Sequence, residues 1–236
     1  PSQLALSGMR YNLHHGSSFA LKKDRQKLWR YPWEKELRLD NVDWKAYYEK
    51  ARGRPPRSLL LSALALENRS SQGEHGLAID LGFGDGTDTL YLLENGWSVL
   101  AIDGEPAAKE RLLAKVPSAQ VGKLTTRITS FESLDLPSAR LIYASLSLPF
   151  CHPDHFAGVW PKIATGLRRT GRFAGNFFGV NDDWAVNDHM TFHTEQHLRT
   201  LLQAFEIEYF HETDEPGSSA SGPKHWHVFT VIDKNR

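Results

Sequence analysis

The sequence contains a single cysteine, Cys151, among its 236 residues. An internal disulfide is therefore excluded, as is any metal or iron–sulfur site built from several cysteines, and a reducing compartment such as the cytoplasm is expected. Long hydrophobic runs are also lacking, because no stretch approaches the ~20 apolar residues of a membrane-spanning helix. With 40% hydrophobic and 24% charged residues, the composition is typical of a globular domain and excludes the collagen-like and disordered classes.

The chain carries no net charge, since 28 Lys and Arg balance 28 Asp and Glu. The balance is uneven, however: residues 1–70 hold 14 basic and 7 acidic residues, whereas residues 71–236 hold 14 and 21. The basic part also contains Trp29, Trp33 and Trp44, and so many large apolar groups argue against a disordered tail. We therefore predict a helical, aromatic N-terminal cap over residues 1–70, packed on a main domain over residues 71–236.

The role of this cap has three interpretations: a lid over an active site, a dimer surface, or a nucleic-acid surface. Lys and Arg interleaved with Trp and Tyr suit the third. The acidic residues are interspersed among them, however, and the whole chain is neutral, so the attraction to a polyanion is modest. Nucleic acid is not expected as a partner, and both a monomer and a homodimer remain open.

Short apolar runs alternate with helical patterns from Leu77 onward. Strands separated by helices imply parallel pairing with right-handed crossovers. The last two strands are joined by a Gly- and Ser-rich segment, residues 214–224, without a helix, which favours an antiparallel hairpin. The predicted fold is α/β, with a doubly wound, seven-stranded, mostly parallel Rossmann-like sheet and a C-terminal antiparallel hairpin. The expected strands are 77–84, 98–103, 124–131, 140–148, 171–179, 206–212 and 225–233; the expected helices are 58–67, 87–95, 106–116, 153–166 and 194–204.

The most informative motif is DLGFGDGTD over residues 80–88, which ends a strand and opens a helix. Gly82, Gly84 and Gly86 permit a tight turn against which a ligand can lie. Seventeen residues later, Asp103 ends the second strand, where its carboxylate can accept both hydroxyls of a ribose. The pattern therefore predicts a nucleoside ligand; the alternative is that the glycines only make a turn and that Asp103 only caps a helix.

A dinucleotide is one such ligand, but the spacing argues against it. A G-x-G-x-x-G pattern would place Thr87 or Thr89 at the third glycine. Asp80 would also lie just before the turn, where a pyrophosphate is repelled. S-adenosylmethionine carries a sulfonium and an ammonium that suit Asp80, and a ribose that suits Asp103.

These residues resemble the first two motifs of class I S-adenosylmethionine-dependent methyltransferases, and the strand pattern is similar over residues 77–236. Within that class, residues 84–103 and 190–215 resemble the tellurite-resistance (TehB-like) group of small-molecule methyltransferases. The resemblance implies S-adenosyl-L-methionine as cofactor. The residues that it implies for cofactor binding are Asp80, Gly82, Gly84, Gly86, Asp103, Gly104, Ser130, Phe131, Glu132 and Ser145.

Candidates for contact with a methyl acceptor follow the fifth strand. Asn176 and His193 offer polar contacts, and Phe177, Phe178 or Trp184 offers an apolar wall; of these, Asn176, His193 and Trp184 are the predicted catalytic residues. A metal face of His189, His193 and His197 would need all three on one helix. Thr194 resembles a helix N-cap, however, which leaves the first two in a loop, so no metal is predicted.

The predicted function is methyl transfer to a small-molecule acceptor, mainly through proximity and desolvation. Thiol, selenide, halide and metalloid acceptors are considered because they attack as anions and need no general base. No Asn/Asp-Pro-Pro-Tyr motif follows the fourth strand, which argues against adenine methylation in DNA. Two alternatives are kept: a methyltransferase that holds RNA or protein through the basic segment, and a non-catalytic sensor or scaffold for an adenosyl ligand.

Overall fold

The structure is a computed structural model that describes residues 53–71, 75–219 and 222–236. The chain divides into two compact units, Pro1–Glu34 and Lys35–Arg236, and every described residue belongs to the second. The expectations for residues 1–52, including those for Trp29, Trp33 and Trp44, lie outside the described residues. None of the helices in the described ranges is long and apolar enough to cross a membrane.

Strands and helices alternate along the described chain, as the apolar runs predict. The helices are α2 Ser58–Ser71, α3 Thr87–Glu94, α4 Pro106–Leu113, α5 Pro153–Gly166 and α6 Glu195–Leu201. The strands are β1 Leu77–Leu81, β2 Ser98–Asp103, β3 Leu124–Ile128, β4 Ala139–Ala144, β5 Leu167–Gly179, β6 Phe192–His193, β7 Phe205–Ser219 and β8 Gly222–Asn235. Short 3₁₀ turns are η3 Ser118–Lys123, η4 Phe131–Ser133, η5 Leu148–Phe150 and η6 Asp183–Val186.

One sheet contains all of these strands, in the order β3-β2-β1-β4-β5-β8-β7. The pairs from β3 to β5 are parallel, whereas β8 is antiparallel to both β5 and β7. The two-residue strand β6 pairs with the end of β5 and brings the total to eight. The predicted seven-stranded, mostly parallel sheet with a terminal hairpin is thus confirmed, with β6 as a small addition.

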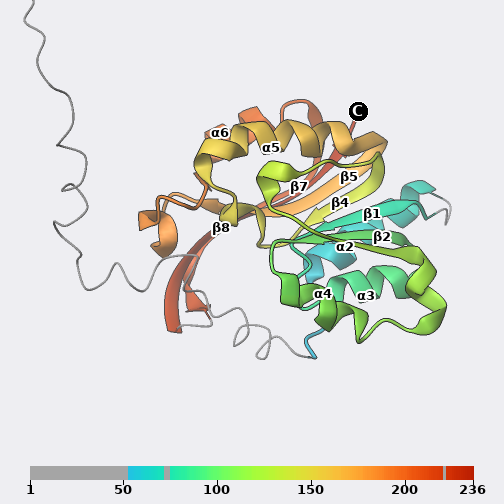
Figure 1. Ribbon diagram of the computed structural model, residues 1–236. Coiled ribbons are helices and arrows are strands. Elements are labelled where there is room, and N and C mark those ends of the chain that lie inside the picture. Colours follow the sequence, from blue (N-terminus) through green and yellow to red (C-terminus); the bar gives the residue numbers. More distant parts are fainter. Residues whose placement is uncertain (1–52, 72–74, 220–221) are drawn as a thin grey trace, which may run out of the picture. The chain divides into compact units, whose positions relative to one another are not determined.

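Helices cover both faces of the sheet, which explains why its central strands are apolar on both sides. Helices α2, α3 and α4 lie on one face, and α5 and α6 lie on the other (Figure 1). In β5, alternate side chains point to opposite faces: Ala174 packs in the core beneath α2, α3 and α4, whereas Phe173 and Phe177 pack in the core beneath α5. We call the first the α2 face and the second the α5 face.

The prediction of a loop over residues 214–224 is wrong. The ladder of β7 and β8 continues through Asp214↔His227 to Ser219↔Gly222, so only residues 220–221 separate the two strands. Pro216 lacks a backbone N–H, but it lies on the edge strand of the sheet, where proline is tolerated. Cross-strand pairing therefore prevails over the turn-like composition.

The helix predicted over residues 58–67 is confirmed as α2, which continues to Ser71. Its apolar side packs on the sheet through Leu60 and Ala63, both fully buried. Near its C-terminal end, the Glu67 carboxylate forms ion pairs with Arg140 and Arg172. This helix is therefore an integral part of the core, although it precedes the first strand.

Candidate functional site

The glycine-rich turn lies between β1 and α3, as the motif predicts. Gly82, Gly84 and Gly86 have φ values of +77°, +57° and +80°, which glycine adopts without strain. Packing adds a second requirement, because a Cβ on Gly82 would lie 2.4 Å from the Cβ of Ser147. A Cβ on Gly86 would lie 2.7 Å from Cδ1 of Leu112. These two glycines are therefore needed for the turn itself, whether or not a ligand is bound.

Asp103 ends β2 directly beside this turn. Its Oδ2 accepts a hydrogen bond from the Gly84 N–H at 2.8 Å, and its Oδ1 accepts one from the Glu105 N–H at 2.8 Å. Burial raises the pKa of Asp103 above its usual value, although these two N–H groups counteract the effect. Each oxygen retains a second lone pair, and a Cβ added to Gly104 would meet only open space. The carboxylate is thus held in one orientation beside an open backbone segment.

Asp80 is the last but one residue of β1 and is only 2% exposed. The Thr89 hydroxyl donates a hydrogen bond to its Oδ2 at 2.6 Å. Burial raises the pKa of Asp80 to about 8, and the negative charge of Asp88 adds to the shift. A buried carboxyl with a raised pKa favours a neighbouring cation, because the cation restores the ionised form.

Two further carboxylates, Asp85 and Asp88, belong to the same motif and are buried. Arg54, which precedes α2, reaches across the turn and contacts both: its Nη2 lies 3.0 Å from Asp85 Oδ1 and 3.0 Å from Asp88 Oδ2. The Tyr143 hydroxyl of β4 donates to Asp88 Oδ2 at 3.2 Å. Asp85 and Asp88 therefore fasten the turn to its surroundings.

The segment predicted for the adenine, residues 130–132, follows β3 and forms the start of η4. It lies near Asp103, because β2 and β3 pair through Asp103↔Ile128 and the Thr129 N–H donates to the Asp103 carbonyl at 2.9 Å. Ser130 is exposed, and Phe131 and Glu132 are half-buried. The structure thus brings this segment to the same sheet edge as the glycine-rich turn.

Asn176 and Ser145 meet where β4 ends. The Asn176 Oδ1 accepts hydrogen bonds from the Ser145 hydroxyl and the Leu146 N–H, both at 3.2 Å. Its Nδ2 donates to the Thr230 hydroxyl at 2.9 Å. Leu146 has φ +53°, a left-handed conformation that costs energy for a residue with a side chain. Asn176 thus holds a strained turn: its Oδ1 accepts two hydrogen bonds, and its Nδ2 donates one of its two protons to Thr230.

Trp184 belongs to η6 and packs in an aromatic cluster, which we define as Phe150, Phe178, Trp184 and Trp226. The ring centroid of Trp184 lies 6.4 Å from that of Phe150, 5.9 Å from that of Phe178 and 5.5 Å from that of Trp226. Phe178 lies at the end of β5, two residues after Asn176, so both side chains are on the α2 face. The predicted apolar wall of Phe178 and Trp184 therefore forms on the side of the sheet that carries Asp80.

A buried lysine completes this cluster. The Lys224 ammonium lies 3.7 Å from the ring centroid of Trp226 and 4.5 Å from that of Trp184, and it forms an ion pair with Asp182. Asp182 also accepts hydrogen bonds from the backbone N–H of Trp184 at 2.9 Å and of His227 at 3.1 Å. Asp182 and Lys224 thus attach the Trp184 turn to β8.

His193 lies elsewhere. Its ring packs against Phe156 of α5 and Phe177 of β5, with centroids 4.8 Å and 5.5 Å away. Burial lowers the pKa of His193 to about 4. Since Phe177 points to the α5 face, His193 and Phe177 are on the opposite side of the sheet from Asn176 and Trp184. The structure therefore does not bring His193 together with the other two predicted catalytic residues.

The three histidines considered as a metal face do not share a helix. Helix α6 begins at Glu195, and the Thr194 hydroxyl accepts from the His197 N–H at 3.2 Å, as expected for an N-cap. His189 and His193 precede the helix.

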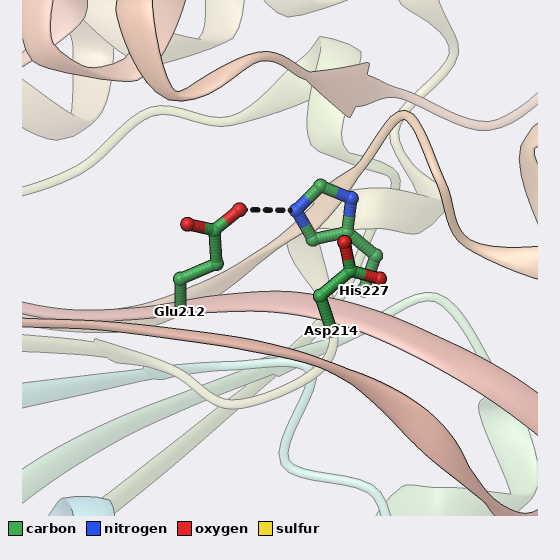
Figure 2. A group of neighbouring side chains, drawn as sticks. All are labelled: Glu212, Asp214 and His227. Atoms are coloured by element: carbon green, nitrogen blue, oxygen red, sulfur yellow. Dashed lines mark hydrogen bonds and ion pairs between the residues drawn. The ribbon is translucent and has the colours of Figure 1, made fainter.

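A different group, Glu212, Asp214 and His227, has ligand atoms within 4.8 Å of one another (Figure 2). However, Nδ1 of His227 accepts the Asn181 N–H at 3.0 Å, so in the neutral ring Nε2 carries the proton, which it donates to Glu212 at 2.8 Å. Neither nitrogen then has a free lone pair for a metal ion, and we interpret the group as hydrogen-bonding support for the hairpin.

Sequence reasoning did not single out Arg54, Asp88, Ser147, Asp182 and Lys224 as parts of this region. Asp88 was visible within the glycine-rich motif, but its partners are 34 and 55 residues away in the sequence. Lys224 falls in the Gly- and Ser-rich segment whose composition predicts a loop, and a loop prediction gives no packing partners for its side chain. Contacts between distant segments carry no periodic signal in a single sequence.

Comparisons with known protein families and solved structures point to the same class of protein as the glycine-rich turn and Asp103. Residues 79–175 match the family described as a methyltransferase domain. No curated protein is similar enough in sequence to be matched.

Similar solved structures share the fold at low sequence identity. TehB from Haemophilus influenzae is 13% identical, with a TM-score of 0.63 over 82% of this chain and 67% of its own. The 1,6-didemethyltoxoflavin-N1-methyltransferase from Burkholderia thailandensis, bound to S-adenosylhomocysteine, is 20% identical, with a TM-score of 0.57 over 82% and 85%. The N-methyltransferase NodS from Bradyrhizobium japonicum WM9 is 16% identical, with a TM-score of 0.58 over 84% and 99%.

The predicted resemblance is thereby confirmed at two levels, the family match and the fold. Residues 79–175 match a methyltransferase-domain family, and the described part of the chain has the fold of solved S-adenosylmethionine-dependent methyltransferases, with TehB among the similar structures.

Proposed function

We propose that the chain is an S-adenosylmethionine-dependent methyltransferase that acts on a small molecule. The observation that carries the proposal is the orientation of Asp103. Backbone N–H groups of Gly84 and Glu105 hold its carboxylate beside the glycine-rich turn, with a free lone pair on each oxygen. That is the arrangement needed to accept the two hydroxyls of a ribose.

The other residues of the sheet edge fit the remaining parts of the same ligand. Asp80, with its raised pKa, would face the cationic methionine end. The segment from Ser130 to Glu132 would flank the adenine, and Ser145 would lie on the sulfonium side. Gly104 leaves room for the nucleoside next to Asp103.

When bound, this cofactor supplies a methyl group on a positively charged sulfur, which an in-line nucleophile can attack. Transfer of that methyl group would leave S-adenosylhomocysteine, which Asp103 and the glycine-rich turn would continue to hold. The chain's own contribution is to hold the two reactants in line and to exclude water. We assign the apolar part of that task to Phe178 and Trp184, and the support of the adjoining turn to Asn176.

Two observations bear on the chemical class of the methyl acceptor: the fold and the groups that line the site. The name of the toxoflavin enzyme indicates that this fold can serve the methylation of a small molecule. An acceptor that attacks as an anion, such as a thiol, selenide, halide or metalloid, would need no general base. This suits a site where the Asn176 amide, which is not a base, supports the Leu146 turn and His193 lies on the other face of the sheet.

Calorimetric titration with S-adenosylhomocysteine tests the cofactor assignment. We expect the wild-type protein to bind, and Asp103→Ala to bind about 10- to 100-fold more weakly, because hydrogen bonds to a charged group contribute ~1.5–3 kcal/mol. Asp135→Ala is the matched control, since Asp135 is exposed on the loop after η4. The assignment fails if the wild-type protein binds neither S-adenosylmethionine nor S-adenosylhomocysteine, or if Asp103→Ala binds as the wild type does.

Mass spectrometry with a labelled methyl donor tests the reaction class. Small-molecule extract and a panel of thiols, halides, oxyanions and amines serve as acceptors, and a labelled small product is the expected result. Label found only in RNA or protein would favour the macromolecular alternative. Binding without any S-adenosylhomocysteine release would favour a sensor.

A further inference from the structure

Four residues before α2, from Arg54 to Arg57, cross the glycine-rich turn. We call this segment the strap. The Arg54 guanidinium contacts Asp85 once and Asp88 twice, at 3.0 to 3.2 Å. The Arg57 N–H donates to Asp88 Oδ1 at 2.9 Å. The strap is therefore fastened to the turn by side-chain and backbone contacts.

These contacts are well shielded from solvent. The side chain of Arg54 is 20% exposed, whereas those of Asp85 and Asp88 are 6% and 5% exposed. Partly buried ion pairs are screened less by salt than surface pairs. Breaking such a pair from one side leaves an uncompensated charge in a poorly solvated place, which costs more than losing a surface pair.

Asp88 connects the strap to the rest of the candidate site. The Tyr143 hydroxyl of β4 donates to the same oxygen that Arg54 contacts. Asp88 also lies in the first turn of α3, one residue before Thr89, whose hydroxyl donates to Asp80. The position of Arg54 thus influences the turn, β4 and the surroundings of Asp80.

We propose that Arg54 is a positioning residue for cofactor binding: the strap latches onto Asp85 and Asp88 and fixes the glycine-rich turn in the shape that receives the methionine end of S-adenosylmethionine. The proposal rests on the proposed function.

The charges around Asp80 supply a readout that a purely structural role would not change. Asp88 of α3 and Asp103 of β2 disfavour its ionised form, and Arg54 favours it. Tyr143 of β4 also interacts electrostatically with it. Loss of the Arg54 charge should therefore raise the pKa of Asp80, so that cation binding requires a higher pH.

The test is calorimetric titration of S-adenosylmethionine into the full chain and its Arg54→Met variant over a range of pH. We expect weaker binding by about tenfold, within the range typical of coupled sites, and a shift of the pH midpoint of binding to higher pH. Arg54→Lys keeps the charge but not the two-pronged contact, so it should recover the pH midpoint and only part of the affinity.

Arg199→Met is the matched control, because Arg199 lies on α6 and forms an exposed ion pair with Glu195. It should leave both affinity and pH midpoint unchanged. If wild-type protein binds no cofactor, the proposed function fails. If wild-type protein binds and Arg54→Met retains both the affinity and the midpoint, only the latch is overturned. Thermal unfolding shows whether Arg54→Met is folded. If it is not, the affinity of Arg54→Lys decides the question, and wild-type affinity in Arg54→Lys would overturn the proposed role of Arg54.

Discussion

At the scale of single residues, the most consequential group is Asp80. The class I pattern suggests a carboxylate that attracts a cation, but burial and Asp88 raise its pKa to about 8. Near neutral pH the free protein therefore holds a proton there. A bound ammonium or sulfonium would lower that pKa, and the proton would leave as the ligand binds.

This linkage predicts that S-adenosylmethionine binds more tightly as the pH rises towards about 8. Below that pKa, ionising Asp80 opposes binding, and the dissociation constant should change by up to about tenfold per pH unit. Above it, the effect should level off. Calorimetry on wild type and on Asp80→Asn checks this, because titration of the ligand itself is common to both. A pH dependence that is the same in both proteins would contradict it.

Site residues can be predicted from the sequence when they are close together in it, as in one motif, and not when their partners lie in distant segments. Gly82, Gly84, Gly86 and Asp103 belong to one strand–turn–helix–strand unit, and the structure brings them together as expected. The sequence around His193 does not indicate on which face of the sheet its side chain lies, because β6 is only two residues long and shows no alternating pattern. Lys224 and Arg54 depend on partners in distant segments, which a single sequence does not pair.

At the scale of elements, the C-terminal hairpin shows where composition misleads. Gly, Ser and Pro in residues 214–224 are typical of a loop, yet β7 and β8 stay paired from Asp214↔His227 to Ser219↔Gly222. The parallel pairing is predictable from the sequence, because helices between strands require crossovers. The extent of an antiparallel pair depends on cross-strand contacts, and these appear only once the register is known.

Strand β8 also carries Asp233, which is fully buried. Among the described residues neither of its carboxylate oxygens has a hydrogen-bond partner. Burial raises the pKa of Asp233 to about 8, with a contribution from Glu208. Because the folded-state pKa lies above the unfolded value, this group destabilises the fold increasingly as pH rises from about 4 to about 8.

Asp233→Asn should therefore raise the free energy of unfolding at alkaline pH, on the order of 2 kcal/mol at pH 9, and much less at pH 5. Urea unfolding at both pH values measures the difference. Asp135→Asn, which changes an exposed carboxylate, should alter neither value. A gain that is equal at both pH values would refute the explanation.

At the scale of the whole described chain, α2 and the strap before it connect the turn after β1 to strands β4 and β5. The strap fastens the segment before it to the glycine-rich turn, and Glu67 near its end pairs with Arg172 of β5 and Arg140 of β4. Arg172 in turn pairs with Glu208 of β7. The helix that precedes the first strand is thus bound to the middle of the sheet and, through Arg172, is connected to its β7 edge.

Glu67→Ala should destabilise the protein by about 3–5 kcal/mol, because it leaves Arg172 buried without its full set of partners. Urea unfolding at neutral pH measures this loss. Glu94→Ala, at the exposed end of α3, is the control and should change stability by less than about 0.5 kcal/mol. A similar small change for both variants would mean that α2 is held by its apolar contacts alone.

The attachment of the Trp184 turn to β8 bears on how this protein can acquire new substrates. Asn181 and Asp182 are bound to His227 and Lys224, whereas the groups assigned to the methyl donor belong to the first half of the sheet. Exchange of residues 181–227 as one block would therefore carry the turn together with its partners on β8, whereas Phe150 and Phe178 of the aromatic cluster would remain. Under the proposed function, natural divergence and laboratory selection could then vary this side of the acceptor site through one contiguous stretch of gene while the donor half is inherited intact.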